Sequence, residues 1–130
     1  MVRRLSLVTL ATLLLPAAAA EGAFPPQGTY RGHTSQGLPM RIEVNGRHLG
    51  NVVFRVADSC GTSHLSASLA DATRIHRDGR FSVVFRSNSH TTWVRGRFRG
   101  RRASGHLRET RIGDDERTCD SGRVRFSVRL

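Results

Sequence analysis

The chain has 130 residues, and its 21 arginines against 10 acidic residues give a formal net charge of +11. This length suits a single domain, and so basic a domain is expected to attract anionic partners. No helix-turn-helix, zinc-finger or RNP-type aromatic pattern is present, which excludes the common modules for sequence-specific nucleic-acid recognition.

Residues 1–20 have the pattern of a signal peptide. Arg3 and Arg4 form a positive start, residues 5–15 are apolar, and alanines at 18–20 fit a small-residue cleavage site. The apolar run is too short for a membrane span, which needs roughly 20 residues. We therefore expect cleavage after Ala20 and a secreted mature chain of net charge 19 − 10 = +9 with no transmembrane segment.

Residues 21–27 contain two prolines and are expected to form an extended N-terminal arm. They precede a single predicted β domain of residues 28–130, in which apolar and polar residues alternate with a period of two. Asn45-Gly46 and Asp78-Gly79 are predicted turns. The predicted strands cover residues 28–34, 40–44, 52–56, 63–70, 81–85, 92–99, 103–111 and 124–130.

About eight short strands and no helix after residue 20 predict an all-β fold. Consecutive hairpins favour a small antiparallel barrel with meander topology, closed or nearly closed, and a two-sheet sandwich is the alternative. The alternation predicts a core made of Tyr30, Met40, Ile42, Val44, Val52, Phe54, Val56, Leu65, Leu69, Phe81, Val83, Phe85, Val94, Phe98, Leu107, Val124, Phe126 and Val128.

Cys60 and Cys119 are the two cysteines of the chain. In an exported protein an even pair is most simply a disulfide. Closing a loop of roughly 60 residues contributes about 4 kcal/mol on the chain-entropy model. A redox pair or a metal-thiolate site is less favoured, because the chain has no C-x-x-C motif.

Residues 93–102 read WVRGRFRGRR, which at first sight suggests an RNA-binding Arg-Gly tract. Alternation argues for a strand instead, with arginines on one face and Val94 and Phe98 on the other. A turn near residues 100–102 leads into a return strand. If the last strand lies near this hairpin, its arginines join the same face of the sheet.

We predict that this face binds anions, with a tryptophan available for stacking. Candidate ligands are envelope or extracellular polymers such as acidic polysaccharide, wall polymer, nucleic acid or anionic lipid headgroups. The alternative is a solvated charged surface that maintains solubility and guards strand edges. The predicted contact residues are Trp93, Arg95, Arg97, Arg99, Arg108, Arg123 and Arg125.

The sequence predicts no enzyme, no metal site and no cofactor. Its six histidines show neither H-x-H nor H-x-x-x-H spacing, and no G-x-S-x-G motif is present. The acidic loop at 113–117 lacks the ligand spacing of a calcium loop. A hydrolase whose residues converge only in the fold is the remaining enzyme class, and a cavity with converging His and Asp side chains would favour it.

Four stretches together resemble a group of small exported bacterial β-domain proteins without an assigned activity. They are GTYRGHTSQG at 28–37, the lone Cys60, GRFRGRRASGHL at 96–107 and CDSGRVRFSV at 119–128. The resemblance covers most of the mature chain, and its motifs are mainly structural. It implies a β fold and carries over no catalytic residue.

The sequence as a whole predicts a secreted, disulfide-stapled, non-enzymatic β-domain protein with an anion-binding face. The alternative is a secreted inhibitor or interaction module that binds through the loops at 34–39, 87–91 and 113–117. Salt would weaken binding through the arginine face strongly and binding through these loops little.

Overall fold

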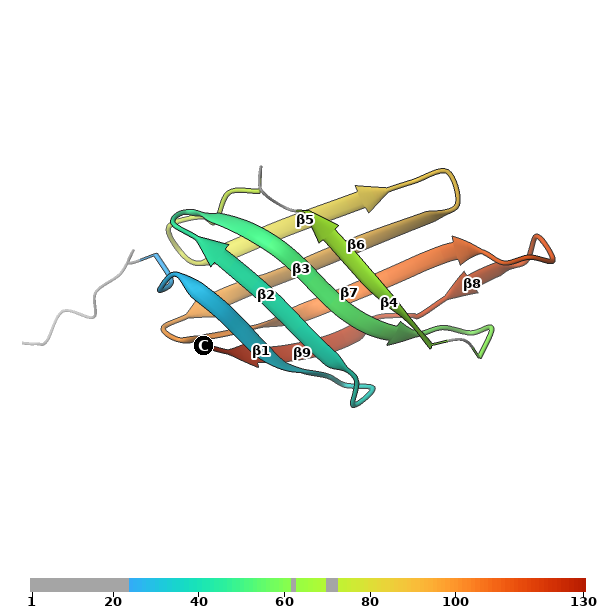
Figure 1. The fold of residues 1–130 in the computed structure, drawn as a ribbon, viewed down its shortest axis with the longest axis horizontal. Coiled ribbons are helices and arrows are strands. Elements are labelled where there is room, and N and C mark those ends of the chain that lie inside the picture. Colours follow the sequence, from blue (N-terminus) through green and yellow to red (C-terminus); the bar gives the residue numbers. More distant parts are fainter. Residues whose placement is uncertain (1–23, 62, 70–72) are drawn as a thin grey trace, which may run out of the picture.

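The computed structural model describes residues 24–61, 63–69 and 73–130, so the predicted signal peptide and the first residues of the arm lie outside it. No helix occurs in this part of the chain, and hence none that is long and apolar enough to span a membrane. Its strands are shown in Figure 1. They are β1 (Gly28–Thr34), β2 (Pro39–Asn45), β3 (His48–Ala57), β4 (Ser63–Leu69), β5 (Arg80–Arg86), β6 (His90–Arg99), β7 (Arg102–Ile112), β8 (Thr118–Asp120) and β9 (Val124–Arg129).

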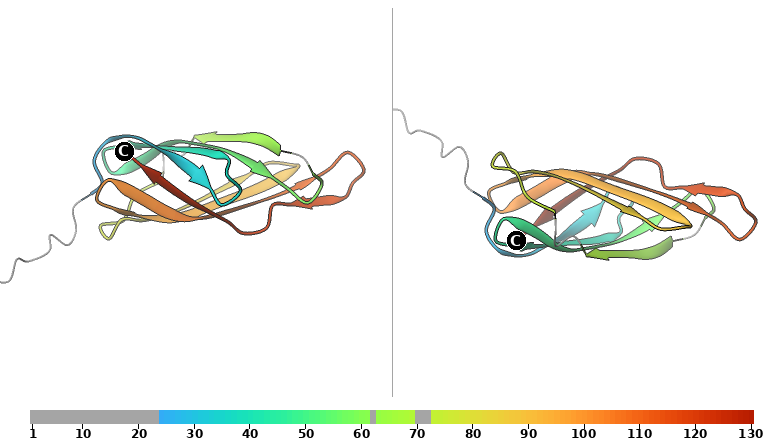
Figure 2. Two further views of the ribbon diagram at one scale, coloured as in Figure 1. Left: turned by 90° about the horizontal axis from the view of Figure 1, so that it is seen from below. Right: turned by 90° about the horizontal axis from the view of Figure 1, so that it is seen from above.

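The strands form one continuous antiparallel sheet in the order β4-β3-β2-β1-β9-β7-β6-β5, with β8 paired to the end of β7. The sheet curls so that β2 to β4 lie over β5 to β7 (Figures 1 and 2). Within the described residues no pairing joins β4 to β5, so the curled sheet is a half-barrel. The prediction of a small all-β, barrel-like fold is confirmed, because one sheet rather than two encloses the core.

The predicted meander is confirmed, because consecutive hairpins join β1 to β4 and consecutive hairpins join β5, β6, β7 and the segment of β8 and β9. β9 lies between β1 and β7 and pairs with both. β8 pairs with β7 at Thr110–Ile112, and after Gly122 (φ 65°) β9 continues in the same direction along the rest of that edge. β8 itself was not predicted, because three residues are too few to show alternation.

The concave side of the sheet holds the core, and most of the predicted core residues are buried there. Leu49 and Ile75 are also fully buried, although they were not predicted. The pairing of β2 with β3 shifts between Ile42 and Val44, and this irregularity turns Leu49 inward against the period of the strand. Phe85 is only partly buried, and the side chain of Leu69 lies outside the described part.

The prediction that Leu65 belongs to the core is wrong, because its side chain is 59% exposed. β4 pairs with β3 so that His64 lies opposite Val56 and Ser66 opposite Phe54, which places His64 and Ser66 on the inner face. A one-residue shift in register exchanges the two faces of a strand. The inner surface opposite β4 carries Glu109 of β7, so the polar residues of β4 face it.

The predicted disulfide between Cys60 and Cys119 is present, with 5.4 Å between the two Cα atoms. It joins the segment after β3 to β8, and so ties the two halves of the curled sheet together. At the opposite end, the described part of the arm also contacts the sheet. The Tyr30 hydroxyl donates to the Pro26 carbonyl at 2.8 Å, and the Gly46 amide donates to Gln27 Oε1 at 3.1 Å.

Candidate anion-binding face

In the hairpin of β6 and β7, Arg95, Arg97, Arg99 and Arg108 project outward, as the alternation predicts. Val94 and Phe98 are buried in the core. Gly96 pairs with Gly105, and a Cβ atom at Gly96 would lie 2.7 Å from the ring of Phe81. The absence of a side chain at Gly96 therefore lets core aromatic rings lie directly on the sheet, and at Gly105 a side chain would collide with the backbone of β6.

Six of the seven predicted contact residues lie on the outer surface of β6, β7 and β9, and Arg123 directly precedes β9. We call this surface the basic face. β9 pairs with β7 and brings Arg125 opposite His106. The members of the basic face are Trp93, Arg95, Arg97, Arg99, Arg108, Arg123 and Arg125.

His106 lies at the centre of the basic face. Arg123 donates a hydrogen bond to its Nε2 at 2.7 Å, the Trp93 ring lies edge-on to its ring at 5.9 Å, and the Arg95 guanidinium lies 5.4 Å from the Trp93 ring centroid. Burial, together with the charges of Arg123 and Arg95, holds the pKa of His106 below its usual value. The neutral ring thus accepts a hydrogen bond from one arginine without adding a further positive charge.

A groove of about 890 Å³ runs over the outer surface of β5, β6 and β7 beside this cluster. Arg95 and Arg97 line it together with Arg80, Ser104 and His106. The adjoining loop is held to the face, since Arg97 Nε donates to the carbonyl of Asp78 at 2.9 Å. The backbone amide of Arg80 and nearby positive charges hold the pKa of Asp78 below its usual value.

Arg108 differs from the other arginines of the face because its charge is paired. Its Nε and Nη2 atoms donate to the two carboxylate oxygens of Asp120 at 3.0 and 2.5 Å. This bidentate pair raises the pKa of Arg108 and lowers that of Asp120. Arg108 therefore offers less positive charge to a ligand than its neighbours.

The three predicted interaction loops lie at one end of the half-barrel, because each follows a strand that runs in the same direction. Gln36 joins the first loop to β3 through hydrogen bonds with the backbone of Ala57 at 2.9 and 3.0 Å. The Ile112 amide donates to the Ser89 carbonyl at 2.8 Å and joins the other two. The alternation of apolar and polar residues predicts that each loop lies between two strands. It does not predict that the three loops lie at one end of the half-barrel.

A buried polar cluster lies inside the same end. His64 Nε2 contacts Glu109 Oε1, and Thr92 donates to Glu109 Oε2 at 2.9 Å. Glu109 is only 3% exposed, and Arg111 Nε pairs with Asp58 at 2.7 Å. Sequence analysis missed this cluster, because its members come from β4, β6, β7 and the segment after β3; a lone glutamate at an inward position of β7 was the available signal.

The cluster shows the convergence of histidine and carboxylate expected of a hidden hydrolase, and His64, His90 and Glu109 line a cavity of about 290 Å³. His64 Nε2 is occupied by Glu109, and Nδ1 is buried 3.9 Å from Asp58. A general base needs a ring nitrogen that can reach a substrate or nucleophile. This arrangement favours a structural role, in which His64 fixes β4 over β7.

Asp58 also lies within 4.8 Å of the two cysteine sulfurs, a grouping that resembles a metal site. Metal binding by cysteine requires the thiolate, and both sulfurs are committed to the disulfide. The Asp58 carboxylate already pairs with Arg111.

Comparison with models of known protein families, with curated protein sequences and with solved structures gave no match. The resemblance to small exported bacterial β-domain proteins therefore stays a prediction.

Proposed function

We propose that this protein is an exported, non-enzymatic binding protein that holds anionic envelope or extracellular polymers on its basic face. The Cys60–Cys119 disulfide supports export, because such bonds persist in oxidising compartments. The positive charge and the shape of the basic face support an anionic polymer as the ligand.

The observation that carries the proposal is the crowding of unpaired positive charge on three adjacent strands. Among the described residues, no carboxylate lies within 4.0 Å of the guanidinium groups of five arginines of the face. Mutual repulsion of these charges is relieved when an anion binds. The five are Arg95, Arg97, Arg99, Arg123 and Arg125.

The surroundings of the arginines favour binding over simple solubility. A solvated charged surface needs no groove, whereas Arg95 and Arg97 line one that also contains the hydroxyl of Ser104. The lowered pKa of His106 reports both its burial and the positive field of Arg123 and Arg95. Trp93 supplies a flat apolar surface beside these charges.

The test is the salt dependence of retention on heparin and on isolated cell-wall polymer. We expect R95Q/R97Q/R125Q to elute at a markedly lower salt concentration than wild type, because fewer counterions are displaced on binding. Glutamine keeps part of the apolar stem of arginine, so packing changes little.

The matched control is R74Q/R86Q/R117Q, which removes the same charge from exposed arginines outside the basic face. If both variants shift elution equally, the basic face acts only through net charge and the proposal fails. Thermal unfolding of all three proteins verifies that the variants are folded.

A second candidate function is an inhibitor or interaction module, favoured by the location of the loops 34–39, 87–91 and 113–117 at one end of the half-barrel. Such a module would slow a secreted protease or glycosidase equally at low and high salt. Inhibition that survives high salt and is unaffected by R95Q/R97Q/R125Q would favour the loops over the basic face.

A further inference from the structure

A row of arginines crosses the sheet at the end opposite the acidic loop. Arg41 of β2 pairs in register with Arg31 of β1, and Arg31 pairs with Arg129 of β9. Arg129 in turn pairs with Arg102 of β7, and Arg102 with Arg99 of β6. Residues paired in this way share one face of a sheet, so five adjacent strands each contribute an arginine to one outer row, which we call the arginine row.

The positive charge of the row is largely uncompensated. Arg41 lies 3.9 Å from Glu43, and its Nε is buried without a hydrogen-bond partner. Within the described residues, the other four arginines have no carboxylate within 4.0 Å. Like charges on directly paired positions destabilise a sheet. The row therefore destabilises the free protein, and binding of an anion offsets the repulsion between its charges.

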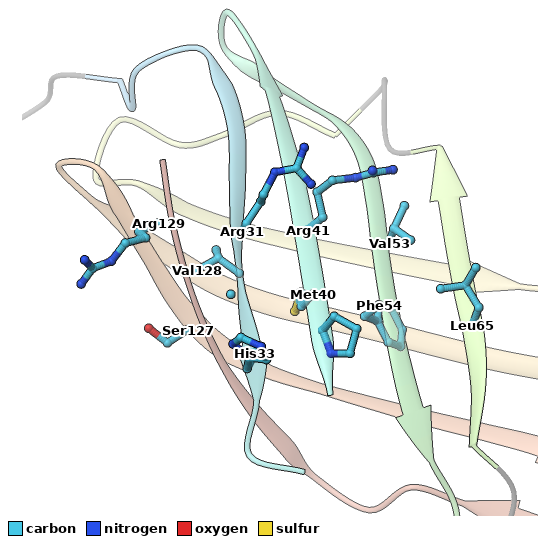
Figure 3. Close-up of a pocket in the computed structure, with 12 residues that line it drawn as sticks. Arg31, His33, Met40, Arg41, Val53, Phe54, Leu65, Ser127, Val128 and Arg129 are labelled. Atoms are coloured by element: carbon cyan, nitrogen blue, oxygen red, sulfur yellow. The ribbon is translucent and has the colours of Figure 1, made fainter. Parts of the chain in front are cut away.

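The curvature of the sheet determines the shape of anion that fits the row. Neighbouring strands are about 4.8 Å apart, so the five arginines span about 19 Å. The row lies on the convex side, where side chains diverge; Figure 3 shows Arg129 pointing away from Arg31 and Arg41. A compact anion can therefore reach only neighbouring guanidinium groups, whereas an extended chain that crosses the strands can contact all of them.

The residues beside the row favour a sugar polymer over a nucleic acid. The next outer row contains the exposed side chains of Ser104, Ser127 and His33, which are in register with one another, and Arg97 of β6 lies in register beside Ser104. These groups can exchange hydrogen bonds with sugar hydroxyls. Binding of single-stranded nucleic acid usually relies on aromatic stacking, and the row contains no aromatic residue; Trp93 lies three outward positions along β6 from Arg99.

A groove of about 770 Å³ extends the arginine row over β1 to β4 (Figure 3). Arg31, Arg41 and Arg129 line it, as do His33 and Ser127 of the neighbouring row. The groove is thus one continuous surface that includes residues of the arginine row and of the next outer row.

We propose that the arginine row is the binding track for an extended acidic polysaccharide, which crosses the strands with about one charged sugar per arginine. This inference rests on the proposed function and specifies the ligand class and its direction across the sheet. Four of the five residues, Arg31, Arg41, Arg102 and Arg129, lie outside the set predicted from sequence.

The experiment measures the affinity of the mature chain for end-labelled oligogalacturonates of increasing length, by fluorescence anisotropy over a salt series. Affinity should rise with length and level off at roughly five sugars, because about 19 Å of surface is then covered. In R31Q/R102Q/R129Q, the low-salt affinity should fall about tenfold or more, and the slope of log affinity against log salt should decrease by about two.

Two control variants test whether the effect belongs to the arginine row. R31K/R102K/R129K keeps the charges and should retain most of the salt slope. R74Q/R86Q/R117Q loses the same charge elsewhere and should bind nearly as wild type. If the row variant matches this control while R95Q/R97Q/R125Q has lost heparin binding, the arginine row is refuted and the proposed function stands. If wild type shows no salt-dependent binding to any polyanion, both are refuted.

Competition decides the ligand class. A single-stranded oligonucleotide of equal charge and vesicles containing anionic phospholipid should each compete less well than the uronate oligomer. Stronger competition by either one, lost in the row variant, would overturn the assignment to polysaccharide.

Discussion

His106 is a hydrogen-bond acceptor within an otherwise cationic surface. Its ring accepts from Arg123 and lies edge-on to Trp93, which orients both side chains. Protonation of the ring would replace this hydrogen bond with repulsion between two cations. Because its folded pKa lies below the unfolded value of 6.5, the stability that this neutral ring provides is complete above that value and is lost as the pH falls through the folded pKa.

We expect R123Q to raise the pKa of His106, because a neighbouring positive charge is removed. The measurement is an NMR titration of the His106 ring protons in wild type and variant. A bound polyanion should also raise the pKa of His106. An unchanged midpoint in R123Q would show that Arg123 exerts no electrostatic effect on this ring.

β4 shows how a partner elsewhere in the fold selects the register of a strand. Leu65 and Leu69 are four residues apart and so lie on the same face of a strand. This spacing favours Leu65 on the inner face. The inner surface at this position instead carries Glu109, a buried carboxylate that must be hydrogen-bonded. Since only the opposite register brings His64 to Glu109, the leucine is left exposed.

A pair of neighbouring substitutions in β4 tests this register. H64A should lower the free energy of unfolding by about 2 kcal/mol, because Glu109 loses a partner while it remains buried. L65A should change it by no more than about 0.5 kcal/mol, as is usual for an exposed site. Both values come from urea denaturation, and the reverse order of effects would show that Leu65 faces the core.

The half-barrel as a whole depends on links between its two halves. β1 and β9 join them through backbone pairing, and the Cys60–Cys119 disulfide joins them near the acidic loop. The sheet has free edges at β4 and β5 within the described residues, so curling is maintained by the core and by these links.

The C60S/C119S variant should lose about 4 kcal/mol of unfolding free energy, because the disulfide spans 59 residues and restricts the unfolded chain. Denaturation of wild type with and without reductant should show a similar difference. A loss below about 1 kcal/mol in both comparisons would show that the core alone holds the half-barrel together.

The candidate surface was predictable in part because alternation is a local property. The outward direction of Arg95, Arg97 and Arg99 follows from a period of two. The sequence predicts Arg102 within the turn near residues 100–102, whereas in the structure it is the first residue of β7 and pairs with Arg99. The bidentate pairing of Arg108 with Asp120 was not predictable, because β8 is too short to leave a pattern.

The order of residues along the chain was sufficient for the fold class, the faces of most strands other than β4, the disulfide and the basic character of β6, since each depends on local periodicity or composition. It left open which strands are neighbours. The pairing of β9 with β1 is long-range, and it alone places Arg129 beside Arg31. The arginine row and the His64–Glu109 contact therefore exist only in the folded sheet, where segments far apart in the chain share one register.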